Sequence, residues 1–206
     1  MTTIVAVRHG ETTWNRKQRL QGWAPAPLSD LGREQVSQLG ERLTAEFDVD
    51  RILSSDLYRA EETVEILLEH VNVPVTFEWA WRERDLGVHQ GLPINEMSKR
   101  FPKYDLGETG PEAAQRRPES GESLVDVRQR VIERWETTLT ECESGETILI
   151  VTHGGPIRLL LGHLKDLNIA ESIMEQSQAN CSINEFEFAH ETGVVRVIRE
   201  NATSHC

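Results

Sequence analysis

The chain has 206 residues, with 34 acidic against 22 basic side chains and a net charge of −12 at pH 7. This length fits a single domain with a substantial core. The negative charge argues against nucleic acid or an anionic membrane as a partner, because both bind basic surfaces. No apolar run in the sequence approaches the roughly 20 residues that a membrane span requires.

The cysteines and the start of the chain indicate a reducing compartment. Cys142, Cys181 and Cys206 are odd in number and lack the spacing of a metal site. Residues 1–3 lead straight into the first apolar run, which leaves no room for a signal peptide. We therefore expect a cytoplasmic protein. The sequence leaves its oligomeric state open between a monomer and a homodimer.

The first predicted element is a short buried strand, Ile4–Val7, which ends at Arg8-His9-Gly10. A strand followed by a cation, an imidazole and a flexible glycine delivers reactive groups to a sheet edge, where open α/β sheets bind ligands. The same arrangement returns near the C-terminus, where the apolar run 148–151 ends in Thr152-His153-Gly154. We therefore expect both histidines to belong to one site at this edge of the sheet.

Between and after these two strands, runs with helical spacing alternate with short apolar runs. The predicted elements in chain order are a loop over 16–27, a helix over 29–47, a strand over 51–53, a helix capped by 54–56, a strand over 73–77, a short helix over 93–101, irregular chain over 102–118, a helix over 124–139, a helix over 157–164, and a hairpin of 183–188 with 194–198. This order predicts an α/β fold, a three-layer α/β/α sandwich with a mostly parallel central sheet. We expect one domain over 1–206 with a variable, cap-like insertion around 92–120.

Two arginines of the predicted strand ends and helix starts are suited to binding phosphate. Arg8 ends the first strand, and Arg59 lies in the first turn of the helix after 54–56, pointing back toward the strand ends. Each guanidinium is a planar fork that matches phosphate oxygens, and two of them neutralise a dianion. Residues 154–156 add a helix start with proline, where unpaired N–H groups bind anions. A phosphate-binding centre is the natural inference.

Phosphate binding alone does not require two histidines and a glutamate, His9, His153 and Glu83. Phosphoryl transfer needs a nucleophile, charge stabilisation and an acid for the leaving oxygen. The sequence has no Walker-type loop and no Asp/His cluster with two-metal spacing. An imidazole nucleophile flanked by arginines works without a metal, since the cations supply what Mg²⁺ would.

Five sequence blocks resemble the histidine phosphatase superfamily, the phosphoglycerate-mutase-like family, in the family's own order. They are Arg8-His9-Gly10-Glu11-Thr12 with Trp14-Asn15; Ser54-Ser55-Asp56-Leu57 with Arg59, Ala60 and Thr63; Glu83-Arg84-Asp85-Leu86-Gly87 with Gln90-Gly91; Gly121-Glu122-Ser123; and Thr152-His153-Gly154-Gly155. The resemblance implies a three-layer α/β/α fold and a histidine acid phosphatase-type phosphomonoesterase. It also implies a phosphohistidine intermediate and no cofactor, with 2,3-bisphosphoglycerate as a primer only in a mutase.

The resemblance also implies a role for each matched residue. His9 is the expected nucleophile, and Glu83 is the expected acid for the leaving oxygen and then the base for the attacking water. The expected phosphate and substrate ligands are Arg8, Asn15, Gln21, Gly22, Arg59, Glu83, His153 and Gly154, and no residue is expected to bind a metal. Two other interpretations remain open: Arg59 paired with Glu61 or Glu62, and Glu83 within a surface ion-pair network.

Family members are phosphatases or phosphoglycerate mutases, and two departures favour hydrolysis here. Pro93-Ile94 occupies the place where the mutase pattern has asparagine and lysine, and Arg116-Arg117 lacks the residues that usually follow the mutase arginine pair. We therefore expect a broad-specificity phosphatase of small phosphorylated metabolites, with a 2,3-bisphosphoglycerate-dependent mutase as the alternative. A non-catalytic phosphate-binding protein and a metallohydrolase are weaker alternatives. Basic residues of the variable segment are candidates for selecting an acidic leaving group: Lys99, Arg100, Lys103, Arg116 and Arg117.

Overall fold

A six-stranded sheet forms the centre of the protein, as the computed structural model of residues 1–205 describes it; Cys206 lies outside the described residues. The strands are β1 Thr2–Arg8, β2 Arg51–Ser54, β3 Val75–Phe77, β4 Thr147–Thr152, β5 Ile183–Ala189 and β6 Val194–Ala202. Their order is β3-β2-β4-β1-β5-β6, in which the first four are parallel and the closing hairpin is antiparallel. The predicted mostly parallel sheet is confirmed.

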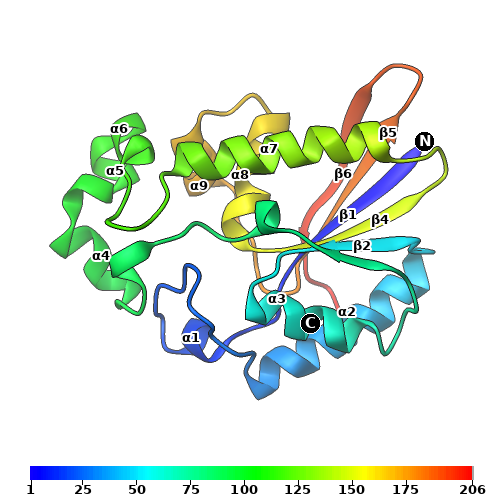
Figure 1. The fold of residues 1–206 in the computed structure, drawn as a ribbon, viewed down its shortest axis with the longest axis horizontal. Helices are drawn as coiled ribbons and strands as arrows, with labels where there is room; N and C mark the ends of the chain where they lie inside the picture. Colours follow the sequence, from blue (N-terminus) through cyan, green and yellow to red (C-terminus); the bar gives the residue numbers. More distant parts are fainter. Residues whose placement is uncertain (206) are drawn as a thin grey trace.

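Helices cover both faces of this sheet, so the molecule has three layers (Figure 1). The long helices are α2 Asp30–Glu46, α3 Tyr58–Leu67, α7 Leu124–Glu141 and α8 Gly154–Leu164. Side chains of a strand alternate between faces. Ile4 and Ala6 of β1 accordingly join the core under α7 and α8, while Val5 and Val7 join the core under α2 and α3.

The segment between β3 and α7 extends beyond the sheet at one end of the molecule (Figure 1, green). Its elements are η1 Trp79–Trp81, η2 Gly87–His89, α4 Ile94–Arg100, η3 Pro102–Tyr104, α5 Leu106–Thr109 and α6 Pro111–Gln115. The expectation of irregular chain over 102–118 is therefore wrong. Asp105 caps α5 by accepting from the Gly107 N–H at 2.8 Å, and Pro111 begins α6. Both helices are too short to show a helical repeat of apolar residues in the sequence, which is why they were not predicted.

Two further short helices were not expected, α1 Thr13–Arg16 and α9 Ile169–Glu175. The predicted cap over 54–56 is also wrong, because α3 begins after Leu57 and has no side-chain cap. Ser55 and Asp56 are engaged elsewhere, Asp56 with Arg82 at 2.6 Å. None of the helices in residues 1–205 has the length and apolar character needed to span a bilayer.

Candidate active site

The two histidines lie next to each other at the carboxyl edge of the parallel strands. His9 follows β1 and His153 follows β4, and these strands are neighbours with Arg8 in register with Thr152. The imidazole centroids are 5.2 Å apart with the rings tilted by 58°. Both side chains are buried. Strand pairing thus brings together residues that are far apart in the sequence.

One guanidinium N–H connects both imidazoles. Nε of Arg59 lies 3.2 Å from Nε2 of His9 and 3.1 Å from Nδ1 of His153. Because arginine only donates, both ring nitrogens accept, and each proton sits on the other nitrogen of its ring. That assignment fits the remaining contacts, in which Nδ1 of His9 donates to the Gly10 carbonyl at 2.7 Å and Nε2 of His153 donates to Oγ of Ser55 at 2.8 Å. His9 therefore presents an unprotonated Nε2 to the centre.

The electrostatics of this centre keep the imidazoles neutral and the guanidiniums charged. Burial lowers the pKa of His9 and of His153 well below the usual value, and the charges of Arg59 and Arg8 act in the same direction. Burial also lowers the pKa of Arg8 and of Arg59 to about 10, partly offset by the charge of Glu83. At neutral pH both arginines are therefore cations beside uncharged imidazoles.

A cavity of about 300 Å³ opens onto this centre. Every predicted site residue lines it except His153, which is buried behind Arg59 and His9. Nη2 of Arg59 donates to the Gly22 carbonyl at 2.9 Å, which fixes the loop after α1 against the centre. The amide oxygen of Asn15 is held by the Thr12 N–H at 3.0 Å, so its NH₂ group is the part that can donate to an anion. Pairing of Arg59 with Glu61 or Glu62 is not observed.

Glu83 is held across the cavity by two backbone N–H groups rather than by cations. Its Oε1 accepts from the N–H of Arg84 at 2.8 Å, and its Oε2 accepts from the N–H of Gly155 at 3.1 Å. Gly155 belongs to the first turn of α8, where the helix dipole favours a carboxylate. Arg82 instead pairs with Asp56, and Glu83 takes part in no ion pair within residues 1–205. The surface-network interpretation therefore does not apply to Glu83.

The loop that carries Glu83 is fixed by the buried side chain of Arg130. The Arg130 guanidinium forms a fork with the Glu122 carboxylate, both bonds at 2.9 Å. Its other N–H groups donate to the carbonyls of Ala80, Arg82 and Glu83 at 2.7 to 3.0 Å. A charged fork with every donor used is a strong, directional anchor. Glu122, from the fourth family-like block, thus holds Arg130 in place, and Arg130 in turn fixes the backbone of the third block at Glu83.

Several residues of the cavity were not predicted. Arg19, Arg84 and Arg158 add three further cations, and the apolar part of the wall consists of Leu20, Leu86, Ile94, Leu124 and Ile173. Arg158 follows Gly154 by four residues on α8, a spacing that puts both on one helix face and that was visible in the sequence. The apolar residues come from separate elements, and no sequence spacing connects them.

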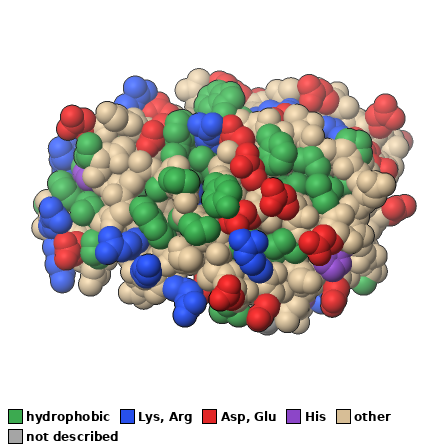
Figure 2. Space-filling view, turned by 60° about the horizontal axis from the view of Figure 1, so that its bottom comes forward, with side chains coloured by type: hydrophobic (Ala, Val, Ile, Leu, Met, Phe, Trp, Pro, Cys, Tyr) green, Lys and Arg blue, Asp and Glu red, His purple; other side chains and the backbone are tan. Residues whose placement is uncertain are grey.

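The basic residues of the variable segment do not reach the cavity. Lys99, Arg100 and Lys103 are exposed on α4 and η3, and none lines the cavity wall. Arg116 and Arg117 pair with Glu112 and Asp126. Figure 2 shows Lys and Arg side chains gathered toward the end of the molecule that carries α4.

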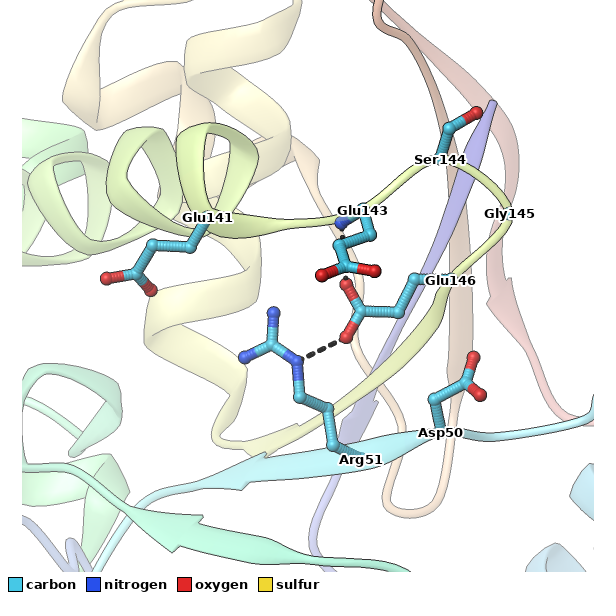
Figure 3. A pocket seen from close by; sticks show the side chains of 7 residues that line it. All are labelled: Asp50, Arg51, Glu141, Glu143, Ser144, Gly145 and Glu146. Carbon is cyan, nitrogen blue, oxygen red and sulfur yellow. Dashed lines mark hydrogen bonds and ion pairs between the residues drawn. The ribbon is translucent and has the colours of Figure 1, made fainter.

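A second hollow, of about 540 Å³, lies at the opposite edge of the sheet (Figure 3). Its lining residues are Asp50, Arg51, Glu141, Glu143, Ser144, Gly145 and Glu146. Arg51 is already paired with Glu146 at 2.5 Å. The remaining carboxylates would repel a phosphate, so this hollow is no alternative phosphate site. Within residues 1–205, no group of three His, Cys, Asp or Glu side chains is placed to hold a metal ion.

Fold and site together define an α/β protein in which two imidazoles and two guanidiniums, those of His9, His153, Arg8 and Arg59, meet at the carboxyl edge of the parallel strands. The model of the histidine phosphatase superfamily (branch 1) matches residues 4–201. The chain therefore belongs to this superfamily of phosphatases and mutases.

Individual relatives include both kinds of enzyme. An uncharacterized phosphatase, PhoE, from Bacillus subtilis is 30% identical over 205 residues, covering 100% of this chain and 97% of the relative. A 2,3-bisphosphoglycerate-dependent phosphoglycerate mutase from Staphylococcus carnosus is 30% identical over 197 residues, covering 82% and 86%. Among solved structures, YhfR from Bacillus stearothermophilus superimposes with a TM-score of 0.88 at 32% identity, covering 100% of this chain and 99% of that one.

Proposed function

We propose that this protein hydrolyses phosphomonoesters of small metabolites through a phosphohistidine on His9. The observation that carries the proposal is the unprotonated Nε2 of His9, held 3.2 Å from Nε of Arg59 in a cavity that also contains Glu83. A nucleophilic lone pair, cations for the phosphoryl oxygens and a carboxyl group for the leaving oxygen meet at one place. These are the parts that the reaction needs.

In the first step Nε2 of His9 attacks phosphorus, and the bond from phosphorus to the ester oxygen breaks. Glu83 gives its proton to that oxygen, which leaves as an alcohol. In the second step Glu83 takes a proton from water, the water oxygen bonds to phosphorus, and the bond to Nε2 breaks. Arg8, Arg59 and Asn15 stabilise the phosphoryl oxygens in both steps, together with the first turn of α8.

Hydrolysis is favoured over mutase activity by the wall of the cavity. Ile94 lines it where the mutase pattern has a polar residue. Arg116 and Arg117 are held by carboxylates, with Arg117 bonded to Asp126 at 2.6 Å. The arginine pair that echoes the mutase pattern is therefore not free to hold a product alcohol for return of the phosphoryl group, which favours water as the acceptor. The apolar part of the wall would contact the carbon skeleton of the leaving group without directional bonds, which supports tolerance of skeletons of different shape.

A phosphorus NMR time course in EDTA tests this function. The sample contains 3-phosphoglycerate, a trace of 2,3-bisphosphoglycerate and p-nitrophenyl phosphate. We expect inorganic phosphate to accumulate without 2-phosphoglycerate, in the absence of any metal or cofactor. Rapid conversion to 2-phosphoglycerate would instead make the protein a mutase, and no turnover of any ester would favour a non-catalytic phosphate-binding protein. Activity that EDTA abolishes and zinc restores would contradict the metal-independent mechanism.

A further inference from the structure

Arginines around the cavity differ from arginines elsewhere in the chain. Those that line it are Arg8, Arg19, Arg59, Arg84 and Arg158, and within residues 1–205 none of the five forms an ion pair with a carboxylate. Eleven other arginines do form such pairs. In a chain with a net charge of −12, this concentration of unpaired cations favours an anionic ligand.

A phosphoryl group alone does not balance these charges. The cavity wall carries five guanidiniums and one carboxylate, that of Glu83. A phosphoryl dianion neutralises two of the five cations, and Glu83 neutralises a third only when it has given up its proton. Glu122 lies near Arg84, but its charge is already taken by Arg130. At least two positive charges of the wall therefore remain for the rest of the substrate.

Among these arginines, Arg158 is partly buried, and its guanidinium makes the weakest hydrogen bonds to the rest of the protein. Its Nε is buried and has no hydrogen-bond partner among the described residues. Its Nη1 makes only a long contact, 3.5 Å, with the carbonyl of Ile173. Arg84, by comparison, donates to the carbonyls of Glu122 at 2.8 Å and Arg116 at 2.9 Å. Nε of Arg158 is too buried for a cavity ligand to reach, so the Nη groups, which make only that long contact, are the donors that Arg158 can offer to a ligand.

The position of Arg158 sets the geometry of such a ligand. Arg158 lies four residues beyond Gly154 on α8, so the two α-carbons are about 6 Å apart along one helix face. Gly154 lies against the Arg8 guanidinium, at the phosphate end of the cavity. Leu124 and Ile173 also line the cavity and offer apolar contact to a short carbon chain.

We infer that Arg158 binds a carboxylate carried by the leaving group of the substrate, a few bonds from the phosphate ester. The planar guanidinium fork matches a carboxylate, and a cavity of about 300 Å³ admits a small phosphorylated acid. This inference rests on the proposed function and specifies its substrate class. Arg158 is thus a specificity-determining residue, distinct from the groups that hold the phosphoryl oxygens.

The test compares two substrates that differ only in the anionic group. 3-Phosphoglycerate carries a carboxylate where glycerol 3-phosphate carries CH₂OH, and kcat and KM are measured for both. The wild type should prefer 3-phosphoglycerate by at least about tenfold in kcat/KM. Arg158→Gln should lower kcat/KM for 3-phosphoglycerate by about 10- to 100-fold, the size of one charged hydrogen bond. On glycerol 3-phosphate the loss should be about threefold at most.

Controls separate local from global effects. Arg196→Gln removes the same charge from an exposed position on β6 and should leave the preference between the two substrates unchanged. Arg158→Lys keeps the cation and should retain part of the preference, and Arg158→Leu replaces Arg158→Gln if that variant melts at a lower temperature. An equal loss on both substrates, no loss on either, or a wild type that prefers glycerol 3-phosphate would overturn the inference. A wild type that hydrolyses neither ester would refute the proposed function instead.

Discussion

The substitution Gly155→Ala tests whether Glu83 is the acid, because it moves that carboxylate without removing it. A β-carbon at position 155 would lie 3.1 Å from Cδ and 3.2 Å from Oε2 of Glu83, and still closer to Oε1. Carbon needs more than about 3.5 Å from such atoms, so the carboxylate has to retreat by on the order of 1 Å. A misplacement of this size costs about 100-fold in rate.

The expected loss depends on how strongly the leaving oxygen needs a proton. With glycerol 3-phosphate, whose alkoxide is a poor leaving group, kcat should fall about 100-fold. With p-nitrophenyl phosphate, which releases a stable phenolate, the fall should stay below about tenfold. The melting temperature should not drop, since alanine is favoured over glycine within a helix by about 1 kcal/mol.

Gly154→Ala is the matched control for this experiment. Its added methyl would lie 3.6 Å from Nε of Arg8, an ordinary contact, and would not meet Glu83. It should therefore leave the ratio of the two substrate rates unchanged. If Gly155→Ala slows both substrates by the same factor, or slows neither, the assignment of Glu83 as the acid is wrong.

Three further predictions concern the buried polar groups. His9→Ala should lower kcat by at least about 10⁴-fold while the protein stays folded, as circular dichroism and a steady-state assay would establish; near-normal activity would exclude the phosphohistidine. Because the folded-state pKa values of His9 and His153 are depressed, the unfolded chain binds more protons below pH 6.5, and stability should fall as pH drops from 6.5 toward 5 by up to about 2.7 kcal/mol per unit. Urea unfolding across this range measures the slope, and a flat profile would contradict the burial of neutral imidazoles. Arg130→Gln should cost about 3–5 kcal/mol of unfolding free energy by leaving Glu122 unpaired, and a loss below about 1 kcal/mol would contradict the anchor described for the Glu83 loop.

The sequence carries the part of this structure that depends on local pattern. Apolar runs that end in His-Gly predicted β1 and β4 and the meeting of His9 with His153, because parallel neighbours expose their carboxyl ends at one edge. Arg59 was predicted to point back to this edge, and it does so by bonding both imidazoles. Local capping also revealed α2, which begins after Ser29.

Contacts between distant segments were not predictable from one sequence. Ser55 was interpreted as a helix cap, although its hydroxyl accepts from Nε2 of His153, 98 residues away. The role of Arg130 depends on three carbonyls about 50 residues earlier in the chain. Helix α9 was missed although Asn168 and Glu171 form a capping box, a local signal that is readable in the sequence. Its seven residues are too few to show helical periodicity.

The placement of both histidines immediately after paired strands limits how this chain can change. In a strand each inserted residue reverses the face on which every later side chain points. A single insertion within β1 would therefore turn His9 away from Arg59 and break its register with β4. The segment from α4 to α6 has no strand of the sheet and supplies only Ile94 to the cavity wall. New substrate preferences can arise there by lengthening or shortening the chain, while the reacting atoms keep their positions.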